Sequence, residues 1–105
     1  MREKTVEIEI NGTKHNVVMK RLTFGERNHL MEEATEVRFS GSVPQAKFSQ
    51  RTWREQGILK SIVSAPFTKT LQEIQNLEQE AGEALYNAFE ELNSLSDRKK
   101  EESKN

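Results

Sequence analysis

The N-terminal region carries the pattern that most restricts how this chain can fold. Residues 5–10 alternate strictly between polar and apolar side chains, which is the period of a half-buried strand. Asn11-Gly12 follows, and both residues tolerate the positive φ angles of a two-residue hairpin turn. Residues 14–20 are then predicted to return as a second strand. Because an isolated hairpin is marginal in water, its apolar face must be covered. The side chains expected on that face are Val6, Ile8, Ile10, Val17 and either Val18 or Met19.

Two helices are predicted from capping residues and apolar spacing. Thr23 and Glu26 match a capping box, so a helix is expected from about 24 to 36. Ser49 can cap a second helix that continues to about Ser64, and Pro66 would end it because the residue before a proline is kept out of the α region. The apolar positions of the two helices are Leu30, Met31, Ala34 and Val37 in the first, and Ile58, Leu59, Ile62 and Val63 in the second.

The middle of the chain has two features with two interpretations each. Residues 38–48 contain Gly41 and Pro44 among serines, which breaks the helical period and predicts a loop. This loop is either a second short hairpin or a mobile arm. Gly57 lies inside the second predicted helix, where glycine costs about 1 kcal/mol relative to alanine. Close packing against a neighbour or a kink would account for it.

The C-terminal part predicts a short helical turn at 70–74 and then the most regular helix of the chain, at about 78–95. Apolar residues recur there at steps of three and four, with Tyr86 and Phe89 widening the stripe formed by Leu77, Ala81, Leu85, Ala88, Leu92 and Leu95. Residues 97–105 have no large apolar side chain, which predicts a disordered, charged tail. The fold class expected is α+β: one domain at 1–96, with an N-terminal β-hairpin packed on three or four α-helices.

Composition excludes several kinds of function. The chain has no cysteine, so disulfides, thiol nucleophiles and Cys-ligated metal sites are ruled out. Sixteen basic and 17 acidic residues give a net charge of −1, which argues against a polycation that coats nucleic acid. No apolar run approaches the roughly 20 residues of a membrane span, and no signal peptide is expected. The protein is therefore expected to act inside the cell, without a membrane partner.

No pattern in the sequence points to catalysis. His15 has no further ligand at metal-binding spacing, and His29 has only Glu32 and Glu33 nearby, a weak set at best. The glutamates of the last helix fall on its polar face rather than in a pocket. Phosphate-binding glycine loops and a nucleophile elbow are also absent from the sequence. We therefore expect no enzyme, no catalytic residue, no cofactor and no metal.

Charge is divided between two segments. Residues 38–60 hold five cations and one carboxylate, a net of +4, whereas residues 70–96 hold six glutamates and no Lys or Arg, a net of −6. Opposed patches favour complementary protein partners, including a second copy of the chain. The residues expected to contact a partner are Arg38, Phe39, Phe48, Arg51, Trp53 and Arg54, with Glu83, Glu90 and Glu91 as complements.

Two other interpretations of residues 38–60 stay open. Aromatic side chains interleaved with cations can stack bases and hold phosphates, although the near-neutral chain and the lack of a nucleic-acid motif do not favour nucleic acid. Alternatively, Phe48 and Trp53 anchor a helix to the core while the cations are solvated.

Four loose motifs follow one another over most of residues 5–96. They are the hairpin start Val6-Glu7-Ile8-Glu9-Ile10-Asn11-Gly12, the helix start Leu22-Thr23-Phe24-Gly25-Glu26, the apolar segment closed by Ala65-Pro66-Phe67, and Leu92-Asn93-Ser94-Leu95. In these motifs and their order, the chain resembles the small tail assembly chaperones of long-tailed bacteriophages and related proviruses.

The resemblance implies a non-enzymatic role in virion assembly. Such proteins keep the long, helical tape measure protein soluble until tail tube subunits polymerise around it. They act in the host cytoplasm and are absent from the mature virion. The alternatives from other classes are a small nucleic-acid-binding protein that uses residues 38–60 and a structural adaptor of the virus particle.

Overall fold

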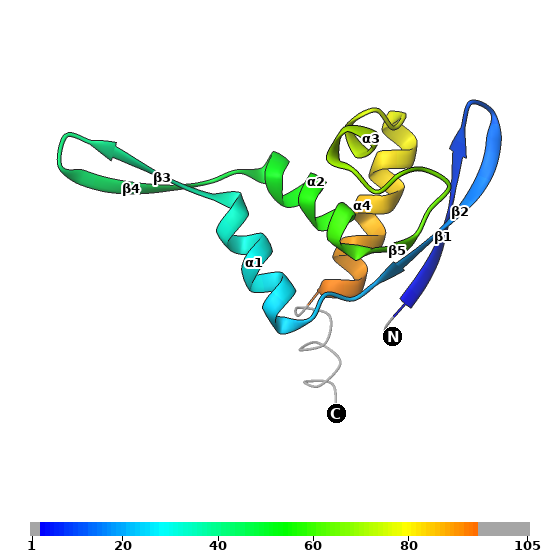
Figure 1. Cartoon of the computed structure of the whole chain (residues 1–105), viewed down its shortest axis with the longest axis horizontal. Coiled ribbons are helices and arrows are strands. Elements are labelled where there is room, and N and C mark those ends of the chain that lie inside the picture. The colour runs from blue at the N-terminus through cyan, green and yellow to red at the C-terminus, as the bar shows by residue number, and fades with distance from the viewer. Residues whose placement is uncertain (1–2, 95–105) are drawn as a thin grey trace.

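The computed structural model describes residues 3–94, with Ser40 described by its backbone alone (Figure 1). The α+β fold class is confirmed, with an N-terminal hairpin and helices packed against it. The tail predicted at 97–105 lies outside the described residues. In chain order the elements are β1 (Glu3–Ile10), β2 (Thr13–Lys20), α1 (Phe24–Ala34), β3 (Thr35–Ser40), β4 (Val43–Phe48), α2 (Gln50–Ser61), β5 (Ile62–Ser64), α3 (Leu71–Gln75) and α4 (Gln79–Asn93).

The N-terminal hairpin forms as its alternation predicts. β1 and β2 pair antiparallel with Val6 opposite Val17. Asn11 and Gly12 have φ angles of 52° and 79°, the geometry that a two-residue turn between twisted strands requires. Of the two candidates for the inner face of β2, Met19 is buried and Val18 is only half-buried.

The core lies between this hairpin and the last helix. α4 contacts β1, β2 and α2. Its apolar stripe is confirmed from Ala81 to Leu92, since Leu85 and Leu92 are buried, whereas Leu77 is half-buried and Leu95 lies outside the described residues. Gly57 of α2 faces Phe89 of α4 so closely that a Cβ atom there would lie 2.6 Å from the ring's Cζ. Close packing, rather than a kink, therefore accounts for the glycine within α2.

Side-chain caps begin three of the helices, two of them, at Thr23 and Ser49, as the sequence predicts. Thr23 Oγ1 accepts a hydrogen bond from the Glu26 N–H while the Glu26 carboxylate accepts one from the Thr23 N–H, which is the predicted capping box. The Ser49 hydroxyl caps α2 by accepting from the Thr52 N–H, and the Thr70 hydroxyl caps α3 by accepting from the Glu73 N–H.

Two predicted helix ends are wrong. The first helix stops at Ala34 rather than at 36, and the second stops at Ser61 rather than before Pro66. After Ser61 the chain turns into β5, which pairs with the outer edge of β2 and makes a sheet of order β1-β2-β5. Because a sheet edge offers backbone partners to the β-branched pair Ile62-Val63, the strand replaces the last helical turn.

The early ends of both helices place Val37 in β3 and Val63 in β5, and the set of buried apolar residues differs from the predicted one. Met31, Val37 and Val63 were predicted to share the inner faces of the helices, and all three are exposed. Leu30, Ala34, Ile58 and Ile62 are buried as predicted.

Residues 38–48 were predicted to be either a second short hairpin or a mobile arm, and the structure shows a hairpin. β3 and β4 form a two-stranded sheet of their own, which projects from the body of the protein (Figure 1). Its base is closed where the Ser49 N–H donates to the Ala34 carbonyl at 2.6 Å. Its turn is at Gly41, whose φ of 68° suits the first position of a tight hairpin turn. Residues 35–48 are called the arm below.

Candidate binding surface

The arm has two faces of opposite chemistry. In an antiparallel pair, residues directly opposite each other point to the same side of the sheet. The register therefore sorts the side chains into two sets. The apolar arm face comprises Thr35, Val37, Phe39, Pro44, Ala46 and Phe48. The polar arm face comprises Glu36, Arg38, Gln45 and Lys47, with Val43 on the same side beside the turn.

The apolar arm face is uncovered. Phe39 is 70% exposed, Val37 59% and Phe48 47%, and every described side chain of β4 is exposed. A sheet of two strands is marginally stable at best without a cover on its apolar face. Exposed apolar groups gathered on one face of a projecting element are typical of a surface that binds a partner.

At its base the apolar arm face continues into the core. The rings of Phe48 and Trp53 lie 5.7 Å apart, and Trp53 meets Phe89 edge-on at 5.8 Å. Phe89 is buried and Trp53 is half-buried. Trp53 therefore anchors α2 to the core, as one interpretation of this segment holds, while Phe48 remains half open to a partner.

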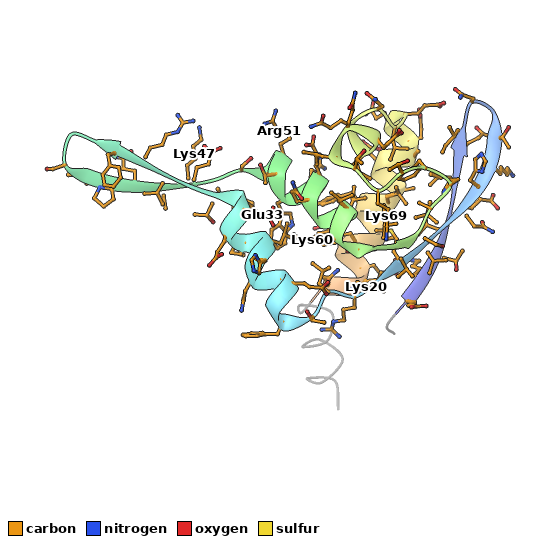
Figure 2. All side chains as sticks on the ribbon, viewed as in Figure 1. Lys20, Glu33, Lys47, Arg51, Lys60 and Lys69 are labelled. Carbon is orange, nitrogen blue, oxygen red and sulfur yellow. The ribbon has the colours of Figure 1, made fainter. Side chains whose placement is uncertain are left out.

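The polar arm face carries its charges into solvent. Arg38 forms an exposed ion pair with Glu36 at 3.3 Å, and Lys47 lies opposite Glu36 in the ladder. Figure 2 shows Lys47 on the arm, well away from the Glu33–Lys60 pair that joins α1 to α2 at 2.8 Å. The cations and the aromatic rings of the arm consequently belong to opposite faces.

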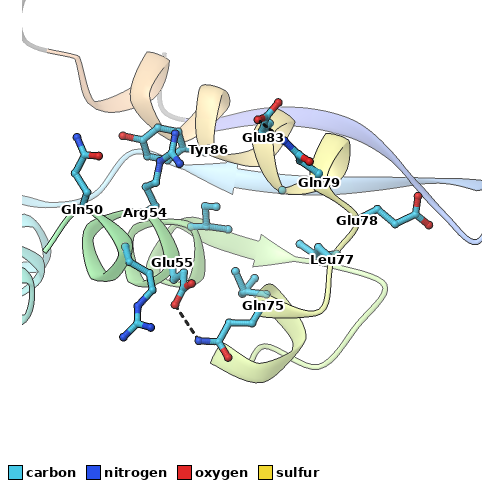
Figure 3. Close-up of a pocket in the computed structure, with 13 residues that line it drawn as sticks. Gln50, Arg54, Glu55, Gln75, Leu77, Glu78, Gln79, Glu83 and Tyr86 are labelled. Atoms are coloured by element: carbon cyan, nitrogen blue, oxygen red, sulfur yellow. Dashed lines mark hydrogen bonds between the residues drawn. The ribbon is translucent and has the colours of Figure 1, made fainter.

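A groove lies between α2, α3 and α4 (Figure 3). It has a volume of about 430 Å³ and an apolar lining that includes Ile58, Ile74 and Leu77. Charged side chains of both signs surround this lining, namely Arg51, Arg54, Glu55, Glu78 and Glu83. The groove thus brings together three of the predicted contact residues from the basic and the acidic segments.

Arg54 is held on one wall of the groove by an aromatic ring. Its guanidinium carbon lies 4.5 Å from the centroid of the Tyr86 ring, a cation–π distance. Burial raises the pKa of the Tyr86 hydroxyl above its ordinary value of 10, and the nearby Glu90 carboxylate raises it further. Tyr86 therefore stays neutral at physiological pH.

The three predicted acidic complements do not form one patch. Glu83 lines the groove and accepts a hydrogen bond from Gln79. The Glu90 carboxylate raises the pKa of the Tyr86 hydroxyl. Glu91 instead forms an ion pair with Lys4 of β1. α4 thus divides the acidic set between its α2 side and its hairpin side, and Glu91 already has a partner within the chain.

Sequence reasoning found Phe39 and Phe48 but missed the other four residues of the apolar arm face, namely Thr35, Val37, Pro44 and Ala46. The signal was present as an alternation on both sides of Gly41-Ser42, in Thr35-Glu36-Val37-Arg38-Phe39 and in Pro44-Gln45-Ala46-Lys47-Phe48. Two short alternating runs around a glycine turn are typical of a hairpin. Val37 also fits the helical spacing of Leu30, Met31 and Ala34, so the alternation of residues 35–39 was interpreted as the end of a helix.

Among residues 3–94, no group of three or more His, Cys, Asp or Glu side chains is placed to hold a metal ion. No helix in this part of the chain combines the length and apolar character that crossing a membrane requires.

Comparison of the chain with protein-family models, with curated proteins and with solved structures finds no match in any of the three.

Proposed function

We propose that this protein is a non-enzymatic binding module that holds an apolar helical segment of a partner on the apolar arm face. The role that fits such a module and the sequence resemblance is that of a tail assembly chaperone of a bacteriophage or provirus. Its partner would be the tape measure protein, the tail tube protein or both. In this role it works in the host cytoplasm and is absent from the mature virion.

The observation that carries the proposal is the exposure of Val37, Phe39 and Phe48 on one face of a projecting hairpin. β3 has six residues, and a strand of that length extends about 20 Å. A helix laid along it would present three to four turns of about 5.4 Å each. An amphipathic helix with apolar residues at spacings of three and four matches such a surface.

The geometry supports nucleic acid less well. Base stacking on Phe39 or Phe48 would need cations on the same side to hold the phosphates, and Arg38 and Lys47 lie on the polar arm face. A structural adaptor would use the same apolar arm face, but it would remain in purified virus particles, which a chaperone does not.

The test is co-expression with a helical fragment of a tape measure protein. The wild-type chain should keep the fragment in the soluble fraction, and Phe39→Ser should lose this effect. Phe24→Ser is the matched control, because Phe24 is also an exposed phenylalanine but lies in α1. Retained solubilisation by Phe39→Ser, or equal loss in both variants, would contradict a role for the arm.

A titration with labelled oligonucleotides at low and moderate salt separates the nucleic-acid alternative. We expect little binding. Binding that falls steeply with salt and is abolished by Arg51→Glu and Arg54→Glu, without any solubilising effect on the fragment, would favour that alternative.

A further inference from the structure

The outer edge of β3 is an unpaired strand edge. Within residues 3–94, β3 pairs with β4 on one side and with no strand on the other. In an antiparallel hairpin with a two-residue turn, the pair flanking the turn exchanges backbone hydrogen bonds, and bonded and non-bonded pairs alternate from there. Counting from Ser40 and Val43, the peptide groups of Thr35, Val37 and Phe39 are directed away from β4. The Thr35 N–H already donates to the Glu32 carbonyl at the end of α1. The outer edge of β3 therefore offers the N–H groups of Val37 and Phe39 together with the outward carbonyls, uninterrupted by proline.

We propose that a second copy of this chain pairs along this edge, β3 against β3, antiparallel about a twofold axis through Val37. In this register, Val37 lies opposite the partner's Val37. Glu36 then lies opposite the partner's Arg38, and Arg38 opposite the partner's Glu36. Each chain therefore contributes one half of two identical cross-strand ion pairs.

The charge pattern of β3 selects this register. Moving the axis by one residue sets Glu36 against Glu36 or Arg38 against Arg38, and like charges directly opposite each other destabilise a sheet. With an axis between two residues, each residue whose peptide groups point away from β4 would lie opposite a residue whose peptide groups point toward its own β4. The hydrogen-bonded ladder between the two copies could then not form. Only the axis at Val37 satisfies both the backbone and the charges over most of the strand.

Pairing would also stabilise the two-stranded arm and cover its open β3 edge. Two hairpins joined through β3 make a four-stranded sheet of order β4-β3-β3-β4, and sheets of three or more strands are stable where two are marginal. The outer edges of that sheet would both be β4, which carries Pro44 and Lys47. Proline and lysine are residues by which natural proteins protect an exposed edge from further pairing. The assembly should therefore stop at two copies.

Opposite residues share a face, so the two apolar arm faces would lie on the same side of the joined sheet. The ion pair that Arg38 makes with Glu36 of its own chain does not oppose the exchange, because both side chains are mostly exposed and such pairs contribute little. The pairing does not require that a helix binds the apolar arm face, so it stands apart from the proposed function.

The experiment is sedimentation equilibrium of the full chain over a concentration series at low and moderate salt. We expect a monomer–dimer equilibrium for the wild type. Glu36→Arg and Arg38→Glu should each weaken the dimer about tenfold or more, because each places like charges opposite each other twice per dimer. An equimolar mixture of the two variants should restore association as a heterodimer. The variant that carries both changes in one chain should restore it as a homodimer.

Glu9→Arg is the matched control. It makes the same charge change at an exposed strand position of β1, and it should leave the dimer unchanged. A wild type that remains monomeric throughout would overturn the inference, as would charge variants that associate like wild type or a mixture no tighter than its components. Dimers lost in Phe39→Ser but not in the charge variants would show face-to-face packing instead and would equally refute the β3 register.

Discussion

The contact between Gly57 of α2 and Phe89 of α4 leads to a prediction in which a glycine-to-alanine substitution has opposite effects at two sites. Gly57→Ala would place a Cβ atom 2.6 Å from Cζ of Phe89 and 2.9 Å from both of its Cε atoms. These distances are too short for carbon atoms in contact, so the ring must shift. The Phe89 side chain is only 1% exposed, and Trp53 and Tyr86 pack against it at 5.8 and 5.9 Å. The ring therefore has little room to move.

The magnitude follows from two opposing effects. Inserting a methyl group into a packed core typically costs about 1–3 kcal/mol. Replacing glycine by alanine inside a helix stabilises the helix by about 1 kcal/mol. We therefore expect Gly57→Ala to lower the free energy of unfolding by up to about 2 kcal/mol. For a domain of this size, each 1 kcal/mol corresponds to a change in melting temperature of about 4–8 °C.

Gly82→Ala is the matched substitution. Gly82 also lies inside a helix, α4, and a Cβ atom there would meet nothing within 4 Å. Only the helix propensity changes, so this variant should be more stable than wild type by about 1 kcal/mol. Urea and thermal unfolding followed by circular dichroism measure both variants against wild type.

The reasoning fails if Gly57→Ala stabilises the protein as much as Gly82→Ala does, because α2 and α4 would then not meet at Phe89. A double-mutant cycle tests whether the Phe89 ring causes the loss of stability in Gly57→Ala. In a Phe89→Leu background the ring is gone, and Gly57→Ala should cost less than it does in wild type. An equal cost in both backgrounds would place the strain elsewhere.

Three further predictions concern the core, a buried polar contact and a titratable cap. Leu85→Ala should lower the free energy of unfolding by about 2–5 kcal/mol, because Leu85 is fully buried; a loss well below this range in urea unfolding would contradict its place in the core. Asn93→Ala should cost about 1–3 kcal/mol and speed amide exchange at Leu22, whose N–H donates to Asn93 Oδ1 at 3.0 Å; unchanged exchange would refute the contact. The Thr23 N–H lowers the pKa of Glu26 below its ordinary value of 4.5, so the Glu26 carboxylate stabilises the fold above that pH, and the contribution is lost as the pH falls through the lowered pKa. Glu26→Gln should therefore be less stable than wild type at neutral pH, and the difference should disappear as the pH falls below the lowered pKa of Glu26; a stability difference that does not shrink on acidification would be the contrary result.

Elements whose signals are contained within a few neighbouring residues were predictable from the sequence. The Asn11-Gly12 turn depends on the φ preferences of two residues, and the caps at Thr23 and Ser49 depend on a hydroxyl reaching an amide three residues away. The stripe of α4 follows from helical spacing alone, because a helix with one apolar face must bury that face.

The candidate site was predictable only in part. Phe39 and Phe48 stood out as aromatic side chains among cations, and both are exposed on the arm. Their separation from Arg38 and Lys47 depends on the register of β3 and β4. Register is a property of two strands together, so the local pattern could show that cations and rings alternate but not that they lie on opposite faces of one hairpin.

Tertiary structure alone decided the features that depend on distant segments. α2 ends at Ser61 because the edge of β2 is available to pair with Ile62–Ser64, and the β-branched pair Ile62-Val63 does not by itself show that this edge is within reach. Gly57 is required by a ring 32 positions later in the chain, and Glu91 is engaged by Lys4 from the opposite end of the domain. Local preferences fix φ and ψ over a few residues, whereas contacts between distant segments are chosen by the packing of the whole core, which no short stretch of sequence contains.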